Sequence, residues 1–196
     1  MIGLERLRNV VQCAENVLDG GIPGDFVETG VWRGGATILM RAILRAYDVT
    51  DRRVWVVDSF EGLPQPDSER YPADERSTLH LLENLRVSLD EVRANFAAFD
   101  LLDDNVQFVK GWFRDTIPAF AGTKLAILRL DGDMYESTWL ALSHLYPKLS
   151  PGGYCIIDDF GAVPECAQAV ADYRAKNNIG TPLSRIDWTG VFWRKP

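Results

Sequence analysis

The chain has 196 residues, of which 46% are hydrophobic and 25% charged, and this length and composition predict one globular domain over residues 1–196. The formal net charge of -7, from 28 acidic and 21 basic residues, argues against a nucleic-acid partner. No apolar run reaches the length of a membrane span and no signal-peptide core opens the chain, so no membrane partner is expected.

The first part of the chain alternates helix and strand patterns. Apolar residues recur at helical spacing over residues 4–18, and two glycines and a proline end that helix. A short strand over residues 26–29 is followed by glycines and by an apolar helix over about residues 36–46. The next strand, over residues 53–58, is apolar on both faces, as expected of a buried parallel strand.

Residues 61–87 are polar and rich in proline. We expect a long loop with one helical turn near residues 79–83, and a loop of this length usually covers a site. Behind it, Ser88 and Glu91 form a capping-box pattern that predicts the start of a helix. The apolar face of that helix is expected to carry Val92, Phe96 and Phe99.

The alternation continues to the end of the chain. Strands are predicted over residues 106–109, 125–128 and 154–157. Helices are predicted over about residues 136–149 and 163–176, with a turn at residues 150–153. Residues 183–186 and 190–194 are expected to form a closing antiparallel hairpin. Strands that alternate with helices predict an α/β fold with a doubly wound, mostly parallel sheet. Ligands of such sheets bind beyond the carboxyl ends of the strands.

The three cysteines carry no metal-site signature. Cys13, Cys155 and Cys166 lie in helical or strand contexts without CxxC spacing. We therefore expect buried free thiols. Together with the missing signal peptide, this favours a cytoplasmic location.

Two aspartate clusters each close an apolar strand: Asp131-Gly132-Asp133 and Asp158-Asp159. Neighbouring strands lie about 4.8 Å apart, and carboxylates held this close repel unless protons or a cation compensate. Oxygen ligands favour magnesium or calcium over zinc. The alternative is that some of these aspartates are only helix N-caps and turn acids. Asp133, beside the cation site, is the candidate general base.

A second candidate site lies at the preceding strand ends. The segment from Glu28 and Gly30 to Gly35 lacks the spacing of a dinucleotide fingerprint, although its glycines let the backbone pass close to a ligand. Asp58 is expected to accept the two hydroxyls of a ribose, and Trp112, after Gly111, is a candidate to flank an adenine. For the glycines alone, a tight turn without a ligand is the alternative.

The strings GDFVETGVWRGGA, VDSFEGLP, LRLDGDMYEST and GGYCIIDDFGAV together resemble the macrocin O-methyltransferase family, whose members methylate sugar hydroxyls of macrolide and aminocoumarin antibiotics. The resemblance spans nearly the whole chain. It implies a Rossmann-like class I methyltransferase fold that uses S-adenosylmethionine, yields S-adenosylhomocysteine, and binds a divalent cation, usually magnesium (Mg2+). It further implies a small-molecule glycoside or deoxysugar as substrate and a homodimer, and it suggests that the family's N-terminal segment ahead of the first helix is missing here.

The resemblance also assigns roles to individual residues. Cofactor contacts are implied for Glu28, Thr29, Gly30, Asp58, Ser59, Gly111, Trp112 and Asp131, metal ligation for Asp131, Asp158 and Asp159, and the general base for Asp133. The expected activity is thus a magnesium-dependent sugar O-methyltransferase of antibiotic biosynthesis. Two alternatives stay open at this point: a metal-dependent hydrolase or phosphoryl-transfer enzyme, and a cofactor-binding protein without turnover.

Overall fold

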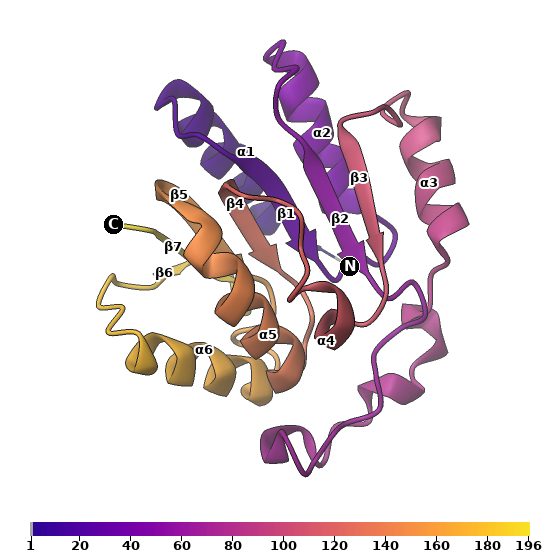
Figure 1. The fold of residues 1–196 in the computed structure, drawn as a ribbon, viewed down its shortest axis with the longest axis vertical. Helices are drawn as coiled ribbons and strands as arrows, with labels where there is room; N and C mark the ends of the chain where they lie inside the picture. Colours follow the sequence, from indigo (N-terminus) through magenta and orange to yellow (C-terminus); the bar gives the residue numbers. More distant parts are fainter. Residues whose placement is uncertain (1) are drawn as a thin grey trace.

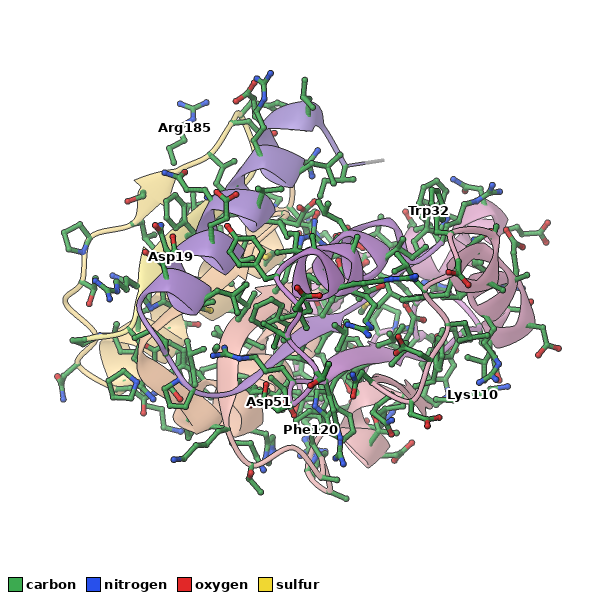
Figure 2. The ribbon with its side chains drawn as sticks, turned by 90° about the horizontal axis from the view of Figure 1, so that it is seen from above. Asp19, Trp32, Asp51, Lys110, Phe120 and Arg185 are labelled. Atoms are coloured by element: carbon green, nitrogen blue, oxygen red, sulfur yellow. The ribbon has the colours of Figure 1, made fainter. Side chains whose placement is uncertain are left out.

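The computed structural model describes residues 2–196, and its strands form one seven-stranded sheet in the order β3-β2-β1-β4-β5-β7-β6. The strands are β1 Asp25–Thr29, β2 Val54–Asp58, β3 Val106–Lys110, β4 Leu125–Leu130, β5 Leu149–Ile157, β6 Ser184–Arg185 and β7 Val191–Arg194. Strands β1 to β5 are parallel, and β7 runs antiparallel to β5 and β6. The predicted mostly parallel sheet with a closing hairpin is confirmed. Lys110 and Arg185, from the two edge strands, lie at opposite ends of the molecule in Figure 2.

Helices cover both faces of the sheet. They are α1 Leu4–Asp19, α2 Gly35–Ala46, α3 Leu89–Ala98, α4 Phe113–Thr116, α5 Tyr135–Leu145 and α6 Pro164–Lys176. Strand residues alternate between the two layers: Phe26 packs with α1 and α2, whereas Val27 packs with α5 and α6. In Figure 1, α5 lies in front of the sheet and α2 behind it. Within residues 2–196, every helix is too short or too polar to cross a bilayer.

The topology fixes where ligands can bind. The chain moves outward from β1 to β2 and β3, then returns to place β4 on the other side of β1. Such a reversal opens a crevice at the carboxyl ends of the strands. Figure 1 shows these ends at one edge of the sheet, with residues 61–87 extending beyond it.

Three local predictions were wrong. The helix expected to reach residue 149 ends at Leu145 and continues as a short 3-10 turn, because Pro147 has no amide hydrogen for the next helical bond. The turn expected at residues 150–153 is part of β5. Phe99 is 66% exposed because it caps the end of α3 rather than facing the core. The capping box is confirmed, since Ser88 Oγ accepts a hydrogen bond from the Glu91 amide at 3.2 Å.

Residues 61–87, which we call the lid segment, contain three 3-10 turns where one helical turn was expected. These are Pro72–Asp74, Leu79–Leu81 and Glu83–Leu85. The fully buried carboxylate of Asp74 accepts hydrogen bonds from the amides of Tyr135 and Glu136, at 2.8 and 2.9 Å. Trp32 Nε1 donates to the Asn84 carbonyl at 2.9 Å. The middle of the lid segment is therefore tied to the start of α5, and its C-terminal part to the loop after β1.

Candidate active site

A cavity of about 760 Å³ opens at the carboxyl edge of the sheet. Most of the predicted site residues line it: Glu28, Gly30, Asp58, Ser59, Trp112, Asp131, Asp133, Asp158 and Asp159. The lid segment contributes Gly62, Leu63, Pro64, Asn84 and Leu85. Thr29 and Gly111 support the cavity from outside its lining, Thr29 as a buried residue of β1 and Gly111 through its amide bond to the Asp58 carbonyl at 3.0 Å. The two candidate sites thus belong to one space.

Gly30 allows β1 and β4 to approach each other at their ends. The Asp131 amide donates to the Thr29 carbonyl at 2.9 Å, which brings the backbone of the first aspartate cluster against Gly30. Gly30 has a positive φ of 81°, and a Cβ atom there would lie 1.9 Å from the Asp131 carbonyl oxygen. A side chain at this position would collide with the backbone of Asp131. Only glycine satisfies both the conformation and the contact.

Asp58 ties the loop after β1 to the end of β2. Its carboxylate accepts hydrogen bonds from the amides of Val31 and Phe60, both at 2.7 Å. Burial raises the pKa of Asp58, and these backbone hydrogen bonds oppose the shift. Ser59 Oγ donates to the Gly62 carbonyl at 2.7 Å. The carboxylate expected to accept ribose hydroxyls therefore also braces the loops after β1 and β2.

The two aspartate clusters come together as predicted from their strand ends. Asp131, Asp158 and Asp159 each present a carboxylate oxygen within 4.8 Å of the others. The Asp133 amide donates to Asp159 Oδ2 at 3.3 Å. Burial, followed by the negative charges of neighbouring aspartates, raises the pKa of Asp133 to about 7 and that of Asp159 well above its usual range. The clustered carboxylates therefore concentrate negative charge, which protons or a cation must balance.

Two arginines lie in this acidic cluster, and sequence reasoning missed both. Arg129 in β4 is 1% exposed, and its guanidinium contacts Glu28, Asp131 at 2.7 Å, and Asp158. Arg6, from α1, contacts Asp158 and also Asp187 at 3.0 Å. The available signal was an arginine inside the otherwise apolar strand LAILRL.

The charge balance leaves room for a divalent cation. The five carboxylates are Glu28, Asp131, Asp133, Asp158 and Asp159, and two guanidinium groups face them. The carboxylates outnumber the guanidinium groups, so negative charge remains for bound protons or a cation to balance. Hard oxygen donors of this kind are suited to magnesium, so the residues present fit the predicted cation.

The other part of the cavity is lined by residues that were predicted to contact a nucleoside. Gly30, Asp58 and Trp112 lie there and supply a close backbone approach, a carboxylate and an aromatic face. Buried Glu28 Oε2 has no hydrogen-bond partner among residues 2–196, and burial raises the pKa of Glu28 to about 8 despite the Arg129 contact. This oxygen at the cavity wall is open to a hydrogen bond with a ligand or with water. The volume lies within the range of ordinary small-molecule sites.

Comparisons with known proteins agree with this geometry over almost the entire chain. The sequence profile of the Macrocin-O-methyltransferase (TylF) family matches residues 1–195. Demethyldecarbamoylnovobiocin O-methyltransferase from Streptomyces niveus is 54% identical over 196 residues, which cover 100% of this chain and 75% of that protein.

Two further relatives extend the agreement. A tetracenomycin-modifying 4'-O-methyltransferase from Streptomyces olivaceus, named for its 2,3-dimethoxy-rhamnosyl substrate, is 55% identical over 195 residues, or 99% of this chain and 74% of that one. The solved structure of the O-methyltransferase NovP superposes with a TM-score of 0.97 at 54% identity, covering 99% of this chain and 81% of that chain. Sequence and fold therefore point to the same group of proteins.

Proposed function

The chain belongs to the macrocin O-methyltransferase family, and from its site we propose that it methylates a sugar hydroxyl of an antibiotic-type natural product with the help of magnesium. The enzyme class itself, an S-adenosylmethionine-dependent O-methyltransferase, follows from the family. The observation that carries the proposal is one cavity in which Gly30, Asp58 and Trp112 adjoin three clustered aspartates and Asp133.

We assign the cofactor to the half of the cavity between β1, β2 and β3. Glu28 and Gly30 would contact the methionine and ribose part, Asp58 and Ser59 the ribose, and Trp112 the adenine. The walls of this half are supported by backbone hydrogen bonds from Asp131 to Thr29 and from Gly111 to Asp58. S-adenosylmethionine, when bound, supplies the electrophilic methyl group.

We assign magnesium to Asp131, Asp158 and Asp159, whose oxygens lie within 4.8 Å of one another. Bound there, the cation would lower the pKa of the acceptor hydroxyl and fix its orientation. Asp133 lies beside these residues and is raised in pKa to about 7 by burial and by Asp131 and Asp158. Bound magnesium would lower this pKa and keep Asp133 ionised, and the carboxylate would then accept the proton of a hydroxyl that the cation has made more acidic.

The reaction then needs one proton transfer by the protein. The Asp133 carboxylate would take the proton of the acceptor hydroxyl while the hydroxyl oxygen bonds to the methyl carbon of the bound cofactor and the carbon–sulfur bond breaks. The products would be a methyl ether, S-adenosylhomocysteine and a protonated Asp133, which would return its proton to solvent. The lid segment, held by Asp74, excludes water from the cavity during transfer.

We propose a glycoside as the acceptor because one relative is named for methylation of a rhamnosyl-bearing tetracenomycin. The three clustered aspartates and Asp133 offer hydrogen-bond acceptors for adjacent sugar hydroxyls. The three buried free cysteines are consistent with catalysis in a reducing cytoplasm.

The test uses the full chain, S-adenosylmethionine and a small panel of desmethyl glycosides that includes demethyldecarbamoylnovobiocin. Methyl transfer is followed by mass spectrometry with and without EDTA, and cofactor binding is measured by calorimetry with S-adenosylhomocysteine. We expect EDTA to abolish turnover, magnesium to restore it, and cofactor affinity to change little. Undiminished turnover after complete metal removal would reject the magnesium assignment, and absence of transfer to every glycoside would reject the acceptor class.

A further inference from the structure

Arg129 lies at a position that strand register dictates. In the sheet it is paired with Glu28 on β1 and with Ile156 on β5. Side chains of paired strand residues share a face, as do residues two apart along a strand. Glu28, Asp131 and Asp158 are therefore the carboxylates that the sheet must bring around this one guanidinium.

The contacts divide the guanidinium among three strands. Its Nη1 donates to Glu28 on β1 and, at 2.7 Å, to Asp131 at the end of β4, whereas Nη2 donates to Asp158 at the end of β5. Arg129 and Glu28 are 1% and 2% exposed. Two of the three candidate metal ligands are thus oriented by separate nitrogens of one rigid, planar group.

We propose that Arg129 is a positioning residue that fixes the Asp131 and Asp158 carboxylates for the divalent cation, an inference that rests on the proposed function. Lysine would keep the charge but offers a single ammonium on a flexible stem, which cannot span both carboxylates. Partners that orient metal ligands typically contribute 10-fold to 100-fold to metal affinity. Arg129→Lys should therefore weaken metal binding by about 10-fold to 100-fold.

The chain contains a matched control for loss of a buried arginine fork. Arg41 in α2 is 6% exposed and makes a bidentate contact with Asp103, with nitrogen–oxygen distances of 2.6 and 3.0 Å. Neither residue lines the cavity. Arg41→Lys and Arg129→Lys should both lower the melting temperature, but Arg41→Lys should leave metal affinity within about twofold of the wild type, because its carboxylate partner has no role in the site.

The measurement is manganese binding to the protein without substrate, by electron paramagnetic resonance of free Mn2+, on the wild type and both lysine variants. Circular dichroism establishes that each variant is folded. Turnover of Arg129→Lys should also recover as manganese is raised, which a purely structural defect would not do. If Arg129→Lys does not fold, the double variant Arg129→Gln/Glu28→Gln is used instead. It removes the buried Glu28 carboxylate that would otherwise lose its arginine partner, and it tests the same two ligands, Asp131 and Asp158.

Each result bears on a different claim. The positioning role is supported if Arg129→Lys binds manganese weakly, Arg41→Lys does not, and excess manganese restores the turnover of Arg129→Lys. It is rejected if Arg129→Lys binds manganese as tightly as the wild type, or no more weakly than Arg41→Lys. If the wild type binds manganese no better than Asp158→Asn, the metal assignment itself fails and the inference falls with it.

Discussion

Gly30→Ala tests whether the close contact between β1 and β4 organises the site. The new Cβ would lie 1.9 Å from the Asp131 carbonyl oxygen, whereas an ordinary carbon–oxygen contact is about 3.3 Å. The backbone of Asp131 would have to move by about 1.4 Å, the difference between these two distances. The positive φ of 81° adds strain for any residue with a side chain.

The expected magnitudes follow from these two effects. A non-glycine residue in this conformation costs about 1–3 kcal/mol, which for a chain of this size lowers the melting temperature by about 2–12 °C. A displacement of about 1 Å at a reacting centre can cost about 100-fold in rate. We therefore expect kcat/KM to fall by about 100-fold and manganese affinity to fall with it.

Gly21→Ala is the control away from the site. Gly21 also has a positive φ, 61°, but nothing lies within 4 Å of a Cβ built there and it does not line the cavity, so alanine should add conformational strain and leave turnover unchanged. Calorimetric melting, steady-state methyl transfer and manganese titration are measured on both variants. If Gly30→Ala matches Gly21→Ala in turnover and manganese affinity, the contact with Asp131 does not organise the site.

Three other measurements probe the lid segment, protonation and α3. Asp74→Ala should remove the two hydrogen bonds from α5 amides to the lid segment, which should cost about 0.5–2 kcal/mol of stability and speed proteolysis within residues 61–87. An unchanged rate of cleavage would show that these hydrogen bonds do not hold the lid segment. In metal-free protein, Glu28 and Asp133 have folded-state pKa values of about 8 and about 7, above those of the unfolded chain. The native state then holds more protons than the unfolded state, so the melting temperature should fall as pH rises from 5.5 to 8. The fall should be smaller in Asp133→Asn and in the presence of Mg2+. A melting temperature that rises over this pH range would contradict the assigned pKa shifts. Ser88→Ala should cost about 0.5–2 kcal/mol of stability by removing the α3 cap without changing turnover, as chemical denaturation and the methyl-transfer assay can show.

Much of the fold could be predicted because local patterns and sheet rules agree. The apolar runs that end at Asp58, Asp131 and Asp158 have the length and composition of buried strands, and their carboxyl ends share one edge in a parallel sheet. The aspartates that meet in space could therefore be named before any coordinates. The predicted end of the helix after Asp133 was wrong, because the pattern of apolar residues runs on past Pro147.

The parts that could not be predicted depend on contacts between distant segments. Nothing near Asp74 in the sequence reveals that it is buried against the start of α5, 61 residues away from Tyr135. Arg6 likewise meets Asp158 only because α1 packs over the end of β5. Arg129 is intermediate: an arginine within an apolar strand is a visible anomaly, but its three partners depend on strand order.

The three cysteines make the chain convenient for spectroscopy. Cys13, Cys155 and Cys166 are at most 1% exposed, and burial raises the pKa of Cys13 to about 12 and those of the other two well above the usual thiol range. Thiol reagents attack the thiolate, so the native cysteines should stay unlabelled in folded protein. A single fluorophore attached through Glu75→Cys, at an exposed position next to Asp74, would then test whether the lid segment moves when ligands bind, with no native cysteine replaced.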